Sequence, residues 1–535
     1  MYKEGVMIII LDRKIIALLM MCSCVWICSS SGMISLCFGE TLQQADMQKR
    51  IEGDLRFLAD DLLEGRGTPS RGLDVASVYL AYQLRSAGLQ PGNDGSFFQT
   101  YPVRHFRSEK AVYNVTINGV DLDPKDFLFF PNGMDPQNQP LKHTIEFAGF
   151  GIFAPERGAN YYENIDVKQK AILAFHGAPW NLSDNVRSCD RIAGKLTQVA
   201  VRGGACLVYV DEEFESPPDK PASEEVALVR SMSGIDSAFI PEFKGKPTMA
   251  FVPLMVITPK VFDKTFNKIF SGTYEEIKKS LSEQKPIEYV SNATIRIQVT
   301  ASTDEGKASN VVAMIRGTDP ALKDEWIVLT AHYDHLGIRD VPEGKDGILN
   351  GADDNASGTA AVLEIARQLV AGPPLRRSML VVLTSGKEMG LLGSAYYAQH
   401  PIVPYDRVIA HINVDAIGRL NEKLFCTATG CDDLFTKVND ISRRHRIVSY
   451  QNNERGLRTV YYTESYHFVR FNVPSIEFST GPHADHHRPG DEVAYIQFDR
   501  IPPIVRIIHQ LVHDYAQGEK KPSFSKPEWF LAMEE

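Results

Sequence analysis

The strongest constraint on this fold is an alternation of apolar strands and helices that runs from Ser309 toward the end of the chain. Strand-like runs such as EWIVLTAH, SMLVVLTS, VIAHINVD and SIEFST alternate with longer segments such as SGTAAVLEIARQLV, whose apolar residues recur with a helical period. Buried strands that alternate with helices are typical of a parallel sheet covered on both faces. We therefore predict an α/β fold with a mostly parallel mixed sheet flanked by helices.

A different pattern occupies residues 141–296. Runs such as HTIEFAGFGIF and KAILAFHG read as strands, and polar loops separate them. This pattern predicts a small β-rich domain inserted into the larger one. Residues 40–140 would then be the N-terminal part of the larger domain, and residues 297–535 would be its main part.

Two amphipathic helices are predicted in residues 47–90, on either side of the loop GRGTPSRG. The apolar face of the first helix would carry Leu55, Leu58 and Leu62, and that of the second would carry Val75, Val78, Tyr79 and Tyr82.

The first 39 residues predict export. Lys3, Arg13 and Lys14 precede a stretch without charge from Ile15 to Gly39, which is typical of a signal peptide or an N-terminal anchor. The protein would be periplasmic, secreted or membrane-anchored. The net charge of −10 argues against general affinity for nucleic acid. Beyond the leader, Cys426 and Cys431 are equally compatible with a small disulfide loop and with buried free thiols.

Histidines and carboxylates stand where the predicted strands end. Because the carboxyl ends of parallel strands meet at one edge of a sheet, these side chains are expected to lie together. Imidazole and carboxylate are the ligand mixture that suits zinc. The residues are His332 and Asp334 in TAHYDHLG, Asp353 and Asp354 in NGADDNASG, Glu388 after SMLVVLTS, Asp415 in NVDAIG, and His483, His486 and His487 in GPHADHHRPGDE.

The order of these segments resembles the M28 family of zinc metallopeptidases. HxD, ADDNASG, GLLGS, NxD and HHxPGD follow one another as in that family, and ADDNASG and GLLGS are present unchanged. The resemblance covers nearly the whole exported chain. Residues 141–296, with AGFGIFAPE and NIDVKQKAILAFHG, resemble the protease-associated domain that many members carry as an insertion.

This resemblance implies two zinc ions. His332 and Asp415 would bind one, Glu388 and His487 would bind the other, and Asp354 would bridge them through a segment with a cis peptide bond to Asn355. Asp334 would orient His332 without itself binding zinc. The resemblance gives supporting roles to His486 and Asp491, whereas Asp353 and His483 are interpreted as structural.

One position departs from the family. The family has two consecutive glutamates where this chain has Lys387-Glu388, so the ligand is kept and the general base is replaced. Three alternatives follow: a neutral lysine that acts as the base, a site with one zinc whose charge Lys387 balances, or a metal-binding relative with weak or no catalysis. Loss of a base need not abolish hydrolysis, because metal polarisation remains.

The sequence therefore predicts an exported zinc metallopeptidase that acts on the N-termini of peptides. The main alternative is a metal-binding pseudopeptidase with weak or no activity. A one-zinc glutaminyl cyclase is a third possibility on a related fold. A serine hydrolase is disfavoured, because the chain has no GxSxG sequence.

Overall fold

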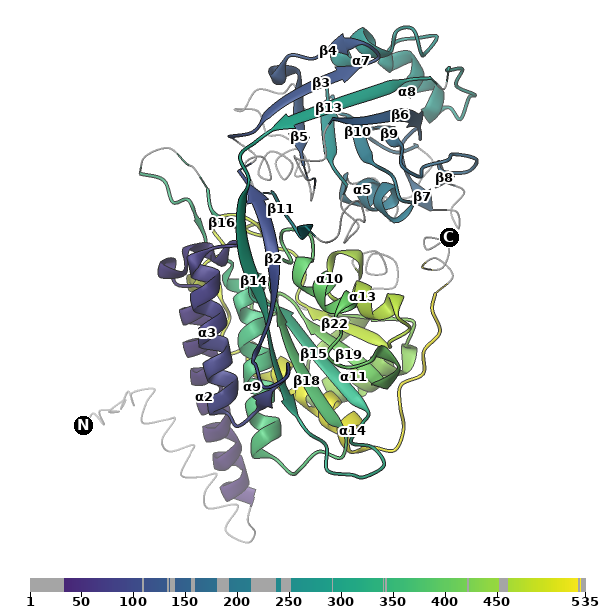
Figure 1. The fold of residues 1–535 in the computed structure, drawn as a ribbon. Coiled ribbons are helices and arrows are strands. Elements are labelled where there is room, and N and C mark those ends of the chain that lie inside the picture. Colours follow the sequence, from purple (N-terminus) through teal and green to yellow (C-terminus); the bar gives the residue numbers. More distant parts are fainter. Residues whose placement is uncertain are drawn as a thin grey trace, which may run out of the picture.

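The computed structural model describes residues 33–530 (Figure 1), with gaps at 108–109, 132–133, 135–139, 155–158, 180–191, 213–236, 242–251, 291, 340, 342–343, 421–422, 452–459 and 528–529. Two sheets dominate it. The larger sheet has the order β11-β2-β14-β18-β15-β19-β22-β20-β21, with β1 paired to β14. The strands are β1 (Gln90–Pro91), β2 (Phe98–Phe106), β11 (Ser237–Phe239), β14 (Asp304–Ile315), β15 (Trp326–His332), β18 (Ser378–Thr384), β19 (Val408–Val414), β20 (Lys423–Thr429), β21 (Val448–Gln451) and β22 (Ser475–Ser479).

Four neighbouring strands at the centre of this sheet, β18, β15, β19 and β22, are parallel, as predicted. Strand β14 runs antiparallel to β18, and β20 runs antiparallel to β22, so the sheet is mixed. The four parallel strands are apolar and almost completely buried, because helices cover both of their faces.

Helices cover the two faces of the larger sheet unequally. On one face they pack around a core that includes Ile327 and Leu329, and on the other they pack around Val328 and Leu380. The first group is α2 (Met33–Leu58), α3 (Arg71–Ser86), α9 (Gly358–Ala371), α11 (Asp432–Arg444) and α14 (Ile501–Gln517) (Figure 1). Helix α13 (Ser465–Arg470) packs against the second core. Helix α10 (Leu392–Gln399) contributes to both, with Leu392 and Ala395 in the first core and Tyr397 in the second.

The two N-terminal helices are present, but their buried faces differ partly from the prediction. Leu55 and Leu58 are buried, whereas Leu62 lies beyond the end of α2 and is 87% exposed. In α3 the buried residues include Leu73, Leu80 and Leu84, whereas Val75, Val78 and Tyr82 are exposed. The prediction chose the wrong face because aliphatic and aromatic residues occur on both sides of this helix.

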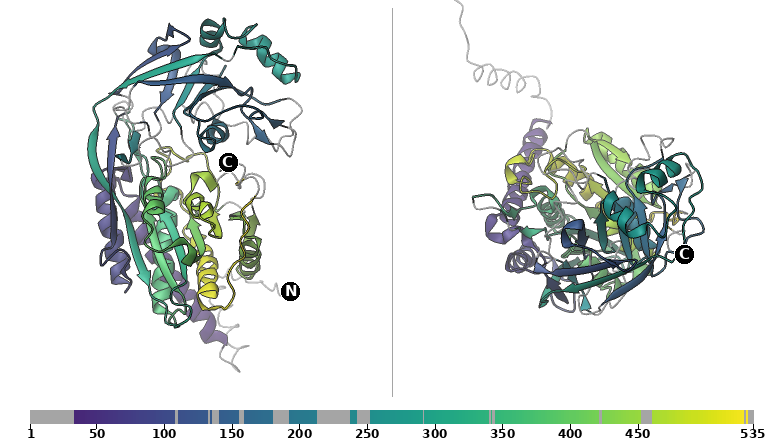
Figure 2. Two further views of the ribbon diagram at one scale, coloured as in Figure 1. Left: turned by 45° about the vertical axis from the view of Figure 1, so that its right-hand side comes forward. Right: turned by 90° about the horizontal axis from the view of Figure 1, so that it is seen from above.

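The second sheet has the order β4-β3-β13-β6-β9-β10-β12-β5 and lies at one end of the molecule (Figure 2). Its strands are β3 (Val112–Ile117), β4 (Val120–Asp121), β5 (Phe127–Phe130), β6 (Leu141–Phe147), β9 (Ala171–Phe175), β10 (Cys206–Val210), β12 (Leu254–Ile257) and β13 (Thr294–Thr300). Its helices are α5 (Ile192–Val201), α7 (Pro259–Phe266) and α8 (Tyr274–Ser282).

The β-rich unit is larger than the predicted range 141–296. Strands β3 to β5 belong to it, because β3 pairs with β13 and β5 pairs with β12. The unit therefore begins near Val112 and ends at Thr300. One of its internal segments, β11, leaves it and adds to the edge of the larger sheet beside β2. The two sheets are thus joined by strand pairing as well as by the two chain crossings.

The loop that follows α2 holds two distant segments through the buried Arg66. Its guanidinium donates to the carbonyl oxygens of Leu58, Tyr333, Asn350 and Gly351, at 2.7 Å for Tyr333 and 2.8 Å for Asn350. These segments carry His332 and Asp354. The arginine therefore links the first helix to both segments on which the site is built.

Two further predictions concern the N-terminal leader and the pair Cys426 and Cys431. Most of the apolar leader, residues 1–32, lies outside the described part of the chain, and residues 33–39 begin α2. No helix in the described part is long and apolar enough to cross a membrane. Cys426 and Cys431 are free and buried, so the structure favours the alternative of free thiols over a disulfide.

Replacing Arg66 with alanine is expected to lower the free energy of unfolding by at least about 3 kcal/mol. Four carbonyl groups would lose their donor, and each buried acceptor left unpaired costs about 1–3 kcal/mol. Urea unfolding would measure the loss. The exposed Arg443, in α11, is the matched control, and its replacement by alanine is expected to change stability by about 0.5 kcal/mol or less. Equal effects for the two variants would contradict this role of Arg66.

Candidate metal centre

The carboxyl ends of the four parallel strands place the predicted ligands at one edge of the larger sheet. His332 is the last residue of β15, and Asp415 directly follows β19. Glu388 follows β18 after a short turn, and His487 lies in the loop after β22. Asp354 comes from the turn that precedes α9. The sequence places each residue near this edge, and the sheet brings them together.

The carboxylate of Asp354 lies at the centre of this group and is completely buried. Its Oδ1 is 3.1 Å from Nε2 of His332, and its Oδ2 is 3.1 Å from Nε2 of His487. Nε2 of His332 is also 3.4 Å from Oδ1 of Asp415, and Nε2 of His487 is 3.4 Å from Oε2 of Glu388. All five side chains therefore converge, in two sets that share Asp354.

The spacing and the unpaired atoms fit divalent metal ions. Ligands at 2.0–2.2 Å from a tetrahedral zinc are about 3.3–3.6 Å apart, close to the separations found here. Both oxygens of Asp354 and Nε2 of His332 and His487 are buried and have no hydrogen-bond partner among the described residues. Such atoms are costly to bury unless a cation or a proton pairs with them. The peptide bond between Asp354 and Asn355 is cis, as the resemblance implied.

The ammonium group of Lys387 lies inside this group of ligands. Its Nζ is 3.5 Å from Oδ1 of Asp354, 3.5 Å from Oε1 of Glu388 and 3.7 Å from Oδ2 of Asp415. A neutral general base would not need three carboxylates around it. The position instead suits a positive charge that balances part of the negative charge of the ligands.

The charges in this cluster stabilise one another when no metal is bound. Burial lowers the pKa of Lys387, but Asp354, Asp415 and Glu388 outweigh it and hold that pKa well above its usual value. Burial likewise opposes ionisation of Asp354, whereas Lys387 and His332 hold the pKa of its carboxyl well below the usual range. In this metal-free state Lys387 is therefore charged.

Two buried carboxylates hold the backbone that carries these ligands. The carboxylate of Asp334 accepts the N–H groups of Lys387 and Glu388 at 3.1 and 3.2 Å, and one of its oxygens is 3.6 Å from Nδ1 of His332. The side chain of Asp334 thus mainly positions the turn that carries Glu388. Nδ1 of His332 lies nearer to the backbone carbonyl oxygen of Asp334, at 3.1 Å, than to its carboxylate.

The carboxylate of Asp491 likewise holds a pair of backbone N–H groups, in the segment of Asp354. Its two oxygens accept the N–H groups of Asp353 and Asp354, each at 3.0 Å, and Arg419 donates to it at 3.2 Å. Asp353 itself accepts from the N–H of Gly418, and Nε2 of His483 lies 3.4 Å from it. These contacts agree with a supporting role for Asp491 and structural roles for Asp353 and His483.

Three more side chains belong to the site. Nδ1 of His486 is 3.4 Å from Oδ2 of Asp354, so this residue, predicted to be supporting, touches the central carboxylate. The sequence reasoning did not single out His335, although it stands three residues after His332 and is an imidazole. Its Nδ1 is 3.3 Å from Oε1 of Glu388. Glu464 is also buried and accepts from Oγ1 of Thr384, and no sequence pattern marked it.

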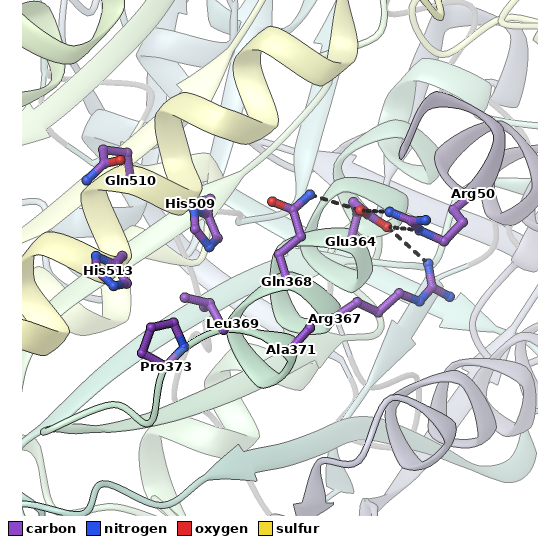
Figure 3. A pocket seen from close by; sticks show the side chains of 11 residues that line it. Arg50, Glu364, Arg367, Gln368, Leu369, Ala371, Pro373, His509, Gln510 and His513 are labelled. Carbon is purple, nitrogen blue, oxygen red and sulfur yellow. Dashed lines mark hydrogen bonds and ion pairs between the residues drawn. The ribbon is translucent and has the colours of Figure 1, made fainter. Parts of the chain in front are cut away.

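A cavity outside this centre lacks these properties. It lies between α2, α9 and α14 and is lined by Arg50, Glu364, Arg367 and His509, among others (Figure 3). Its buried carboxylate, Glu364, already accepts from Arg50 at 2.6 Å and from Gln368 at 2.9 Å. With its charge balanced locally, this cavity does not compete with the centre around Asp354 as a metal site.

Replacing Asp491 with asparagine is expected to lower zinc affinity about 10–100-fold, the usual effect of losing a group that positions metal ligands. One amide oxygen cannot replace the two carboxylate oxygens that hold the N–H groups of Asp353 and Asp354. Competition with a zinc chelator would measure the change. The control is Asp485→Asn, because Asp485 also binds Arg419 but not this backbone. Similar zinc affinity in both variants would contradict this role.

Comparisons with known proteins agree with this geometry. Residues 310–512 match the family model of Peptidase family M28. Aminopeptidase YwaD of Bacillus subtilis is 25% identical over 282 residues, which are 51% of this chain and 57% of that protein. The protein named "Probable lipoprotein aminopeptidase LpqL" of Mycobacterium tuberculosis is 33% identical over 130 residues, 24% of this chain and 23% of that protein.

A solved structure of an aminopeptidase from Aneurinibacillus sp. strain AM-1 aligns with a TM-score of 0.49 and 16% identity, over 90% of this chain and 96% of that chain. The chain spans between about a quarter and just over half the length of the curated relatives it matches. The matched segment includes every residue that converges on Asp354. Residues 310–512, which carry this centre, are therefore similar to peptidase family M28.

Proposed function

We propose that this chain is an exported zinc metallopeptidase that removes residues from the N-termini of peptides. The observation that carries the proposal is the convergence of His332, Asp354, Glu388, Asp415 and His487, with several of their donor atoms buried and unpaired. Zinc is the metal named for relatives of this chain, and aminopeptidase is the activity named for others. Export rests on the sequence of the first 39 residues.

Zinc held by these side chains would act as a Lewis acid in hydrolysis of a peptide bond. The chain itself contributes the arrangement. Asp354 holds the two ligand sets together, and Asp334 and Asp491 fix the backbone of the ligand segments. Lys387 stands at the position where the family has its proton-transferring glutamate. Its charged ammonium group would oppose proton uptake but would attract the carbonyl oxygen or the carboxylate of a peptide.

The β-rich unit is proposed to be a protease-associated domain that limits access to the centre. Thr197 of α5 hydrogen-bonds Tyr462, which lies two residues before Glu464. An apolar cluster shared by Leu196, Val460 and Tyr461 joins the unit to the same segment. Access control predicts faster cleavage of short peptides than of long ones with the same N-terminal residue. Equal kcat/KM for a tripeptide and a long peptide would contradict it.

The second candidate function is metal binding with weak or no peptidase activity. The position of Lys387 favours it, because the ammonium group replaces the general base and also contacts three ligands. A positioned base is worth about 10²–10⁴-fold in rate. The two candidates share the metal centre and differ only in turnover.

Turnover of aminoacyl chromogenic substrates tests the proposed activity. Cleavage is expected to require a free N-terminus, to stop after chelation and to return with added Zn²⁺. Asp354→Asn is expected to abolish it, because this carboxylate contacts both ligand sets. Zinc binding without turnover would favour the second candidate. Formation of pyroglutamate from a peptide with N-terminal glutamine would instead indicate a glutaminyl cyclase.

Replacing Lys387 with glutamate is expected to raise kcat/KM, by up to about 10²–10⁴-fold. The substitution places a carboxylate at the family's proton-transfer position and removes a positive charge beside Asp354 and Asp415. Zinc per chain is expected to rise toward two. Kinetics against pH and metal analysis of both forms would measure the effects.

Lys387→Gln is the matched control, because it removes the charge without adding a base. We expect this variant to raise the zinc content. We expect its kcat/KM to stay below that of Lys387→Glu. A protein with unmodified Lys387 that already holds two zinc ions and works at full peptidase rates would contradict the idea of a weakened enzyme. A lower rate with a shifted pH profile in Lys387→Glu would indicate that the lysine itself is the base.

A further inference from the structure

The two oxygens of Asp354 face different surroundings. Oδ1 lies 3.1 Å from Nε2 of His332 and 3.5 Å from the ammonium group of Lys387. Oδ2 lies 3.1 Å from Nε2 of His487, 3.4 Å from Nδ1 of His486 and 3.8 Å from Nδ1 of His335. One side of the carboxylate is therefore shared with a fixed positive charge, and the other side faces only imidazoles.

No hydrogen bond to the described residues explains the burial of His335. The side chain is fully buried, and neither ring nitrogen has a hydrogen-bond partner among the described residues. Its ring occupies space that only a glycine leaves open, since a Cβ on Gly351 would lie 2.5 Å from the ring. The ring also makes an edge contact with His487, at 5.8 Å between centroids. An imidazole that is held in place, buried and unpaired is suited to bind a metal.

The neighbours of His335 complete a set of four ligands. Its Nδ1 lies 3.3 Å from Oε1 of Glu388, and Oε2 of the same carboxylate lies 3.4 Å from Nε2 of His487. Oδ2 of Asp354 lies 3.1 Å from Nε2 of His487 and 3.8 Å from Nδ1 of His335, so these adjacent pairs are spaced near the edge length of a tetrahedral zinc site, about 3.3–3.6 Å. Donor atoms of His335, Asp354 and Glu388 also lie within 4.8 Å of one another.

We propose that His335 is a zinc ligand and that the position formed by His335, Asp354, Glu388 and His487 binds the first and tighter zinc. This inference rests on the proposed function and extends it. Four protein ligands make a closed site of the structural kind. The position of His332, Asp354 and Asp415 has three protein ligands, so it keeps a place open and is the catalytic position.

The charges of the nearby side chains determine which of the two metal positions zinc occupies first. Asp354, Glu388 and Asp415 contribute three negative charges, and Lys387 contributes one positive charge. One Zn²⁺ therefore makes the group neutral, whereas a second leaves an excess of two positive charges. The ammonium group lies beside ligands of both positions, at 3.5 Å from Asp354, 3.5 Å from Glu388 and 3.7 Å from Asp415. It opposes each zinc, but the second zinc meets it after the first has neutralised the group. Repulsion from it weakens the second zinc more than the first.

Zinc titration of the metal-free full chain with chelator competition tests the proposal. One tight zinc per chain is expected. His335→Ala is expected to weaken binding of this tight zinc at least about 10-fold. Losing a ligand costs at least as much affinity as losing a group that only orients a ligand, which is about 10–100-fold. His332→Ala is expected to leave the tight zinc in place. His483→Ala is the matched control, because His483 contacts Asp353 instead of Asp354. Circular dichroism would establish that each variant is folded.

X-ray absorption of the unmodified chain at one zinc per chain gives a test that needs no variant. At least two imidazole nitrogens are expected, whereas the position of His332 would supply one. A single imidazole, or a tight zinc that survives His335→Ala and is lost in His332→Ala, would overturn the proposal. Tight binding without peptide hydrolysis would contradict only the proposed peptidase activity. A chain that binds no zinc would contradict both.

Discussion

The charge balance around Asp354 is the constraint on which the rest of the site depends. Three carboxylates lie together at one edge of the sheet, and carboxylates buried without partners are unstable. In the metal-free chain, Lys387 supplies part of the balancing charge, and the carboxylates raise the pKa of His332 and His487 against the effect of burial, so these imidazoles supply more of it. The same ammonium group lies 3.5 Å from Asp354 and from Glu388 and 3.7 Å from Asp415, so it touches ligands of both sets. The positive charge at this one position is thus coupled to all three carboxylates.

The ligands keep their places because buried groups outside the metal set hold the backbone. Arg66 binds carbonyl oxygens next to the segments of His332 and Asp354. Asp334 and Asp491 accept pairs of N–H groups from the turn of Glu388 and from the segment of Asp354. Each of these groups joins segments that are far apart in the sequence. Metal affinity is therefore a property of this network as well as of the ligands.

The β-rich unit is part of the same arrangement. Its strand β11 pairs with the edge of the larger sheet, and α5 packs against the segment that precedes Glu464. Glu464 in turn accepts a hydrogen bond from Thr384, at the end of β18, two residues before Gly386 and three before Lys387. Contacts thus run from the unit, through the segment of Glu464, to the strand that leads to Lys387 and Glu388.

The sequence by itself determined the order of the elements and the types of ligand. The apolar runs that end at His332 and before Asp415 had to be buried strands, and their carboxyl ends had to meet, so most of the site was predictable. Only the tertiary structure decided the roles of His335, Glu464 and Arg66. The groups that they contact lie on other segments, so the sequence pattern does not reveal them. The burial of an unpaired imidazole, or of a guanidinium that binds four carbonyl groups, arises only when those segments pack.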